Sequence, residues 1–342
     1  MNPEPLKPHY PFEPIGTIDA LARVLGVDSG RLVAIATNAD RLYRLAKPII
    51  KADGSIRQPF DALPPLKEIH RALKVRVLVR VRYPSYLTGS LVGRDYRANA
   101  GLHAGSKIVM CEDVRDFFPS IKVQAVRDVW QRLFQFPPRV AELLTQICTK
   151  DGALPQGAIP SSYIANLVLW RFEPDLHARL AAGGLVYSRY VDDIVVSSKR
   201  SLTKDDQTQV VGAVYGMLAK AGLRAKRRKH ERFTASQRMV TTKLVVNRRA
   251  ALPKEMRAKI RASVHRVELL SQAGLLDAEG LRLQRSVAVR VGQLGRFHPR
   301  LAVQLKERLS RARRRQGEVE QRLSLTEFDA HSPLESMNKP RS

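Results

Sequence analysis

The chain has 342 residues, 44% of them hydrophobic, which indicates a globular protein with two or three packed subdomains. Its 59 lysines and arginines against 32 aspartates and glutamates give a net charge of +27, which indicates a polyanionic partner because phosphate contacts release counterions. Having only two cysteines, Cys111 and Cys148, excludes a disulfide scaffold, and the lack of a signal-peptide core or a long apolar run leads us to expect a cytoplasmic protein with no membrane partner.

The first third of the chain predicts short helices and a basic hairpin. Apolar residues recur at helical spacing over residues 18–45, which indicates two or three short helices. Residues 47–57 form two basic, strand-like arms around an Asp-Gly turn, and such an arm can fold over a triphosphate. A basic helix is predicted over residues 63–81.

The middle of the chain predicts one strand followed by helices. Residues 107–114 alternate as a strand does, and Asp113 lies near its end. Helical spacing then recurs in three segments, residues 123–134, 139–148 and 161–181. The last of these is predicted to be one long apolar helix, closed by Gly183 and Gly184.

Residues 187–198 are two apolar runs joined across Asp192 and Asp193. Their β-branched and aromatic residues predict a hairpin with both acids at its tip, although such a pair alone is most often a solvated turn. Two carboxylates held at one point, with a third from elsewhere, suit a pair of magnesium ions for an in-line phosphoryl displacement. Asp113 is the candidate third carboxylate, and a helix N-cap is its alternative role.

The last part of the chain predicts helices separated by basic blocks. An amphipathic helix is predicted over residues 204–222, followed by the densest basic block at residues 224–232. Residues 243–247 are a strand candidate, and residues 253–315 predict a basic helical bundle. The polar residues from about 327 onward are expected to be disordered.

Four segments resemble, in order and spacing, the motifs of reverse transcriptases. The motif A match runs from Asp113 to residue 121, motif B covers residues 154–158 and 165–167, motif C is residues 190–193, and motif D leads from residue 222 to Lys229. The resemblance implies an α+β right-hand polymerase with an antiparallel palm sheet and a helical thumb. Its expected parts are an N-terminal helical extension at 1–42, fingers at 43–105, a palm at 106–238 with a fingers insertion at about 122–150, a basic thumb at 239–326 and a disordered tail at 327–342.

The resemblance also implies a role for individual residues at the motif A and motif C acids. Asp113 and Asp192 would bind two Mg²⁺ ions with the Val114 carbonyl assisting, while Asp193 shapes the site and ligates more weakly. Lys229 is the candidate general acid that protonates pyrophosphate, and a plain contact with a nucleic acid backbone is its alternative.

Five further residues match positions that contact the dNTP substrate. Phe118 matches the residue that stacks under the sugar and excludes a 2′-hydroxyl, unless it is a core phenylalanine like its neighbour. Gln156 matches a glutamine that contacts nucleotide and template, and Gly157 would let the backbone approach closely. Lys51 and Arg57 match the fingers residues that hold the phosphates.

Two features resemble the retron type of reverse transcriptase. Asn99 and His103 match its Asn-Ala-x-x-His signature and would order a loop and touch structured RNA; a helix cap and a packed histidine are the alternative. Residues 241–247 resemble a Val-Thr-Gly segment and its strand, so Thr242 and Lys243 are candidate RNA contacts. Lys243 stands where the glycine is expected, which suggests a turn that is built differently.

The retron resemblance implies an RNA-directed DNA polymerase that copies part of a cognate non-coding RNA into 2′–5′ branched, RNA-linked single-stranded DNA (msDNA). It further implies phage defence together with a separate effector protein. Two alternatives stay open, another bacterial defence-associated reverse transcriptase without a branched product and a non-catalytic RNA-binding scaffold. The acids, Gln156 and the fingers cations favour an enzyme over the scaffold.

Overall fold

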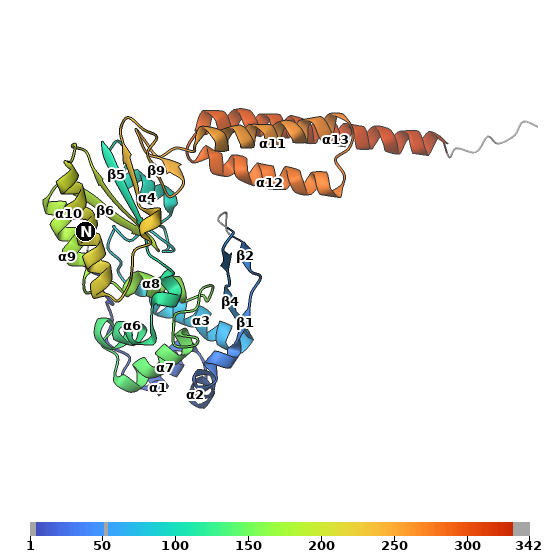
Figure 1. Cartoon of the computed structure of the whole chain (residues 1–342). Coiled ribbons are helices and arrows are strands. Elements are labelled where there is room, and N and C mark those ends of the chain that lie inside the picture. The colour runs from blue at the N-terminus through green and yellow to red at the C-terminus, as the bar shows by residue number, and fades with distance from the viewer. Residues whose placement is uncertain (1–4, 51–53, 331–342) are drawn as a thin grey trace, which may run out of the picture. The chain divides into compact units, whose positions relative to one another are not determined.

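A computed structural model of the chain describes residues 5–50 and 54–330 (Figure 1). The chain divides into two compact units, Met1–Ala250 and Ala251–Ser342. Each unit has a hydrophobic core of its own. We describe the two units separately.

An antiparallel sheet of four strands, built from residues 108–234 of the described chain, organises the first unit. In spatial order its strands are β6 (Leu185–Tyr190), β7 (Asp193–Ser198), β5 (Ile108–Asp113) and β8 (Glu231–Thr234). The hairpin predicted over residues 187–198 is therefore confirmed as β6 and β7, and the strand predicted over residues 107–114 as β5.

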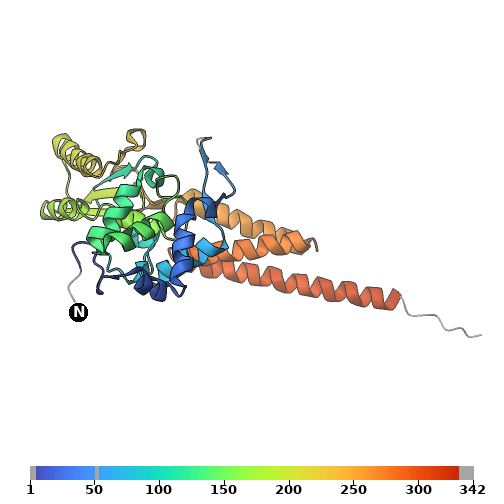
Figure 2. The same ribbon diagram turned by 90° about the horizontal axis from the view of Figure 1, so that it is seen from below.

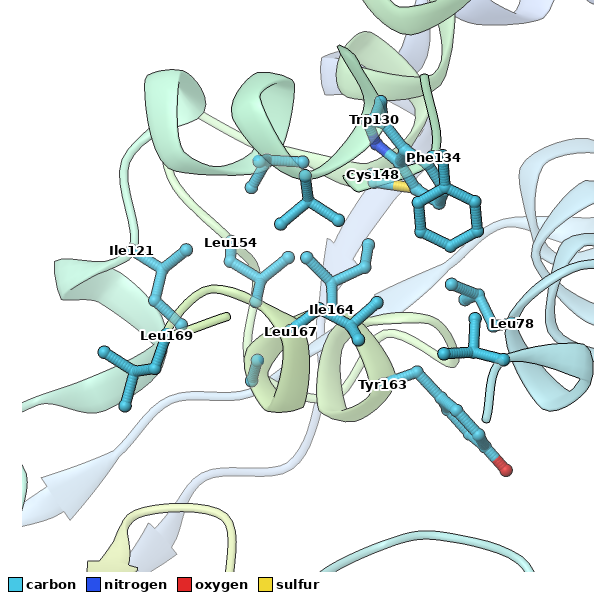
Figure 3. Packing of buried hydrophobic residues seen from close by; sticks show 14 of the residues in the cluster. Leu78, Ile121, Trp130, Phe134, Cys148, Leu154, Tyr163, Ile164, Leu167 and Leu169 are labelled. Atoms are coloured by element: carbon cyan, nitrogen blue, oxygen red, sulfur yellow. The ribbon is translucent and has the colours of Figure 1, made fainter. Parts of the chain in front are cut away.

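Helices surround this sheet in the first unit. They are α1 (Ile18–Leu25), α2 (Ser29–Thr37), α3 (Pro64–Arg76), α4 (Tyr96–Leu102), α5 (Phe117–Ser120), α6 (Val123–Asp128), α7 (Pro138–Cys148), α8 (Ser161–Leu167), α9 (Glu173–Ala182) and α10 (Lys204–Lys220). Figure 3 shows part of the core, in which Ile164 and Leu167 of α8 lie among buried residues that include Leu154 and Trp130. α8 is thus anchored in the core of the first unit.

The long helix predicted over residues 161–181 is wrong, because α8 ends at Leu167 and α9 begins at Glu173. Pro174 lies in the first turn of α9 and has no backbone N–H. In a continuous helix its ring would clash with the carbonyl of Trp170, so the chain turns between the two helices. The break places Glu173 at the start of α9, close to β6.

Two small antiparallel pairs form the basic arm that the sequence predicts. β1 (Tyr43–Leu45) pairs with β4 (Phe60–Ala62), and β2 (Ile49–Ile50) pairs with β3 (Ile56–Arg57). Lys51, a predicted phosphate contact, lies outside the described residues. Arg57 is the last residue of β3 and pairs with Ile49.

A second hairpin ends the first unit. β9 (Val240–Thr241) pairs with β10 (Leu244–Val245), and the two residues between them, Thr242 and Lys243, take left-handed backbone angles with φ of 45° and 66°. The strand is thus shorter than predicted, with Lys243 in the turn. The Thr242 hydroxyl donates to the Tyr96 carbonyl at 3.0 Å, which ties the hairpin to α4. The hairpin accordingly belongs to the first unit.

The second unit contains α11 (Lys254–Gln272), α12 (Ala278–Gly295) and α13 (Pro299–Ala330), which lie side by side (Figures 1 and 2). Valine and leucine side chains from the three helices form its core, and Arg308 of α13 pairs with Glu268 of α11. The predicted helical bundle is confirmed, and α13 extends to Ala330, past the expected start of the disordered tail. Among the described residues, no helix is long and apolar enough to cross a membrane.

Candidate active site

The three predicted acids meet at one edge of the central sheet. Asp113 ends β5 and stands directly opposite Asp193, the first residue of β7. Asp192 lies in the turn before β7, and its carbonyl accepts the N–H of Val114 at 3.0 Å. The alternative role of Asp113 as a helix N-cap is wrong, since Asp116 holds that position before α5. The register alone therefore brings the three acids together.

Crowding shifts the protonation of two of these acids. Burial, followed by the charges of Asp192 and Asp113, raises the pKa of Asp193 to about 7. Burial also raises the pKa of Asp192, with the charge of Asp113 adding to the shift. Three cations oppose these shifts, Arg57 and Lys229 at Asp192, and Lys229 and Lys243 at Asp193. The acids thus face positive side chains from three separate segments.

Lys229 makes the closest of these contacts. Its Nζ lies 2.5 Å from Oδ2 of Asp113, and this hydrogen bond raises the pKa of the Lys229 ammonium. The next residue, His230, pairs through Nδ1 with Oε1 of Glu112 at 2.5 Å, while the Tyr215 hydroxyl donates to Oε2 of Glu112 at 2.9 Å. Two consecutive residues of one segment therefore hold two consecutive acids of β5.

Backbone pairing extends the sheet beyond Asp113. The N–H of Lys226 donates to the Asp113 carbonyl at 2.7 Å, and the N–H of Arg115 donates to the Arg224 carbonyl at 2.8 Å. A cavity of about 1130 Å³ opens beside this pairing, and Ile56 of β3 lines its other side. The cations that line it are Arg115, Arg224, Lys226, Arg227 and Arg228. Its charge suits a polyphosphate.

The donor chemistry at this edge fits Mg²⁺, which prefers carboxylate oxygens. Within residues 5–50 and 54–330, no three His, Cys, Asp or Glu side chains stand together as a complete metal-binding set. The Lys229 ammonium instead holds Asp113. A divalent cation would supply the positive charge that Asp192 and Asp193 need, so the acids fit the ion once Asp113 exchanges Lys229 for it.

The predicted nucleotide contacts occupy different environments. Phe117 is buried in the core, whereas Phe118 is only partly buried and packs against that core. Gln156 is partly buried, and its carbonyl accepts the N–H of Phe60 at 2.7 Å. Gly157 has φ of 106°, and a Cβ there would lie 2.6 Å from the Phe60 carbonyl oxygen. In this structure the close approach that Gly157 permits is to the backbone of β4.

Asn99 and His103, the predicted RNA contacts, have 0% exposed side chains, so neither side chain is accessible to RNA in this conformation. Asn99 Nδ2 donates to the hydroxyls of Thr88 and Ser188 at 2.9 and 2.8 Å. The His103 ring bonds with Ser188 at 2.7 Å and with Ser197 at 2.8 Å, and burial lowers its pKa to about 4. The packed-histidine alternative is confirmed, while the cap of α4 is Asp95 and not Asn99. These residues tie α4 to β6 and β7.

The second pair of predicted RNA contacts lies at the turn of the β9–β10 hairpin. Lys243 is exposed and Thr242 is partly buried. The left-handed backbone at Lys243 is the conformation that glycine adopts without strain, so the turn keeps a glycine-like geometry with a lysine in it. The charge of Lys243 slightly opposes the rise in the pKa of Asp193.

Sequence reasoning missed a buried ion pair that joins strand β6 of the hairpin to the start of α9. Arg189 and Glu173 are 0% and 1% exposed, and Arg189 Nε lies 2.6 Å from Glu173 Oε1. The available signal was a charged residue within an apolar strand, three positions before Asp192. Such a charge is buried only when it is paired.

Comparison with known proteins identifies the family. A profile described as reverse transcriptase (RNA-dependent DNA polymerase) matches residues 44–268. The retron Se72 reverse transcriptase of Salmonella heidelberg (strain 579083-10) is 34% identical over 263 residues, which are 76% of this chain and 69% of that protein. The retron Ec48 reverse transcriptase of Escherichia coli is 35% identical over 272 residues, 75% of this chain and 66% of the relative. The retron Mx162 reverse transcriptase of Myxococcus xanthus is 27% identical over 284 residues, which are 73% of this chain and 59% of that protein.

The relatives thus extend beyond the part that this chain matches, since it covers 59% to 69% of their lengths. The family profile covers well over half of this chain and includes the whole edge where the three acids meet. The chain therefore belongs to the reverse transcriptase family, the RNA-dependent DNA polymerases, and within that family to the retron reverse transcriptases.

Proposed function

We propose that this chain copies part of a cognate, structured non-coding RNA into DNA and that the product is 2′–5′ branched msDNA. The similarity to retron reverse transcriptases supports the partner RNA and the RNA-linked DNA product. The observation that carries the catalytic part is the strand register, which sets Asp113 against Asp193 with Asp192 in the adjoining turn.

Asp113 and Asp192 would hold two Mg²⁺ ions, with the Val114 carbonyl assisting and Asp193 as a weaker ligand. When bound, these ions would activate the attacking hydroxyl and stabilise the charge that develops on the phosphates. The hydrogen bond from Val114 N–H to the Asp192 carbonyl keeps the two strand ends aligned. The carboxylates are thereby held in place before substrate arrives, which lowers the entropy lost in the reaction.

The substrate would be a dNTP bound between the basic arm and the sheet edge. Arg57, together with Lys51 and the cations of the 1130 Å³ cavity, would bind its triphosphate. Phe118 would lie under the sugar and exclude a 2′-hydroxyl, which its partly buried ring leaves possible. Gln156 would contact the nucleotide and template.

Lys229 would act as the general acid for the leaving pyrophosphate. Its ammonium stands at the sheet edge, half-exposed, with a proton held at Nζ by Asp113. Delivering that proton requires Nζ to leave Asp113, which substrate phosphates in the adjoining cavity would favour. A contact between Lys229 and the nucleic acid backbone is the alternative.

The polymerase arrangement follows as part of the same proposal. The central sheet would be the palm, the β1–β4 arm the fingers, and the basic helices of the second unit the thumb. Thr242 and Lys243 would meet nucleic acid close to the acids, because the charge of Lys243 reaches Asp193. Phage defence, a separate effector protein and a cytoplasmic location remain predictions.

One experiment tests the proposed product. The protein is purified with its bound nucleic acid, deproteinised, and digested separately with RNase and with DNase. We expect a DNA strand that keeps a short RNA remnant after RNase and loses it on treatment with a 2′–5′ debranching enzyme. DNA without a branch would support the other defence-type reverse transcriptase, and RNA alone, with or without added dNTPs, would support the scaffold.

A further inference from the structure

The turn that presents the acids has an unusual backbone. Val191, between Tyr190 and Asp192, takes φ of 61°, in the left-handed region. A β-branched residue rarely adopts this conformation, which costs about 1–3 kcal/mol and persists only where its surroundings enforce it. The surroundings of Val191 should therefore contain groups that hold the turn.

Arg189 supplies the first of these groups. All of its guanidinium nitrogens donate hydrogen bonds, although its side chain is fully buried. Nη1 donates to the Val191 carbonyl at 3.0 Å and to the Ala165 carbonyl at 3.3 Å, and Nη2 donates to the Asn166 carbonyl at 3.0 Å. The guanidinium group of Arg189 thus joins α8 to the Val191 carbonyl, which immediately precedes Asp192.

The Glu173 carboxylate orients the Arg189 guanidinium and neutralises its charge. Its two carboxylate oxygens accept Arg189 Nε at 2.6 Å and Nη2 at 2.8 Å, in the bidentate geometry that fixes a guanidinium plane. The Tyr187 hydroxyl donates to Glu173 Oε1 at 2.7 Å and fixes the carboxylate in turn. Glu173 reaches this position because the chain breaks before Pro174 and starts α9 there.

A loop holds the opposite side of the turn. The N–H of Thr88 donates to the Arg189 carbonyl at 2.9 Å, and Asn166 Nδ2 donates to the Gly89 carbonyl at 2.8 Å. A Cβ on Gly89 would lie 2.5 Å from the Val191 nitrogen, so the loop touches the turn directly. The same α8 segment that accepts from Arg189 also fixes this loop.

We propose that Arg189 and Glu173 form a positioning pair that holds the Val191 turn and so sets the direction of Asp192 and Asp193. The inference rests on the proposed catalytic role of these acids. Neither member of the pair touches substrate; the pair acts through the Val191 carbonyl and through α8. A pair that served stability alone would need no bond to the residue before Asp192.

Replacing both members separates positioning from stability. A buried ion pair exchanged for apolar residues of similar size is often neutral or stabilising, whereas removing one partner leaves a buried charge. Arg189→Met with Glu173→Met should therefore fold, with a melting temperature close to that of the unaltered protein. It should lose the bond to Val191, and with it the set direction of the acids.

The test measures Mn²⁺ binding to the full chain by electron paramagnetic resonance and primer extension on an annealed RNA template. We expect the double variant to bind Mn²⁺ about tenfold more weakly and to lose about 10–100-fold in kcat, with the KM for dNTP unchanged. Arg189→Lys keeps the charge that neutralises Glu173 but loses the bidentate guanidinium, so its Mn²⁺ affinity and kcat should also be lower than those of the unaltered protein. A matched control is Glu268→Met with Arg308→Met, which removes another bidentate pair in the second unit and should leave Mn²⁺ affinity unchanged.

The outcomes separate this inference from the proposed function. A folded double variant with unaltered Mn²⁺ affinity and kcat would overturn the positioning role. If the double variant does not fold, the same two measurements on Arg189→Lys decide, and unaltered values overturn the role equally. Asp192→Ala is the reference: if it keeps full primer extension, the proposed catalytic acids are wrong rather than the pair beneath them.

Discussion

The ammonium nitrogen of Lys229 lies 2.5 Å from Oδ2 of Asp113, the carboxylate oxygen that the proposed chemistry requires for a metal ion. The two residues come from segments that pair through the backbone, since the N–H of Lys226 donates to the Asp113 carbonyl. Lys229 would therefore both compete with the proposed metal ion for Asp113 and stand beside it as a proton donor. These two roles lead to opposite effects of one substitution.

Lys229→Met should strengthen metal binding and weaken catalysis. Removing the ammonium frees Asp113, and because a half-exposed ion pair is worth at most about 1 kcal/mol, Mn²⁺ affinity should rise by no more than about fivefold. Loss of the proton donor should lower kcat by about a hundredfold. Titration calorimetry and single-turnover extension measure the two effects. Lys220→Met, at the exposed end of α10, is the control, and a variant with unchanged kcat would favour the backbone-contact alternative.

Asp193→Asn should stabilise the metal-free protein. The folded pKa of about 7 lies above the usual value of 3.8, so the folded state holds its proton more tightly and loses stability as pH rises from about 4 to 7. Asparagine removes this loss, and we expect a higher melting temperature at pH 8 in EDTA. Added Mg²⁺ should raise the melting temperature of the unaltered protein more than that of the variant. Equal gains would show that Asp193 has no part in metal binding.

Phe118→Ala should relax the choice of sugar. With the ring gone, a 2′-hydroxyl no longer meets a steric barrier, and the ratio of kcat/KM for dNTP over rNTP should fall at least about tenfold. The neighbouring Phe117→Ala is the matched control, because Phe117 is buried in the core. It should reduce stability by about 3–5 kcal/mol without changing the ratio. Equal ratios for both variants would remove Phe118 from the nucleotide site.

The sequence predicts well where the three candidate acids lie, because local patterns define that edge of the sheet. Strand periodicity locates Asp113, and apolar runs around Asp192 locate the hairpin, so the register follows from pairing two strands. The burial of polar residues is harder to predict from the sequence. Asn99 and His103 could equally have faced RNA, but in the structure both bond to the buried Ser188. Which partner they meet depends on how α4 packs against the sheet, and no spacing in the sequence records it.

Two other errors have the same origin. The apolar stretch over residues 161–181 suits a helix throughout, and only Pro174 marks the turn that brings Glu173 to the hairpin. Arg189 was passed over because charged residues are usually exposed, and its partner lies on a different element. Both features depend on a contact between two separate elements, α9 and β6, and that contact forms only when the chain folds.

The stability of the first unit should fall in mild acid, in part because of His103. Burial lowers its folded pKa to about 4 from 6.5, so the unfolded state binds a proton first, and stability present above pH 6.5 is lost as pH falls toward 4. The loss from this group is up to about 3 kcal/mol. His103→Gln should flatten the change in melting temperature between pH 7 and 5, while His70, also lowered to about 4 by burial, keeps the rest of the slope. Identical slopes would mean that His103 is not buried in solution.

Lys243→Gly should have two effects that can be measured separately, because it relieves the backbone strain of the turn and removes a positive charge. Lysine at φ of 66° carries the left-handed penalty of about 1–2 kcal/mol that glycine avoids, so the variant should melt at a higher temperature. It also loses one cation beside the acids, which should weaken binding of primer and template and reduce the dependence of log affinity on log salt by about one unit. Filter binding over a salt series measures that slope. Lys243→Asn, which tolerates the left-handed region and also removes the charge, should reproduce the lost slope. If both variants bind with the original salt dependence, Lys243 supports the hairpin turn and does not contact nucleic acid.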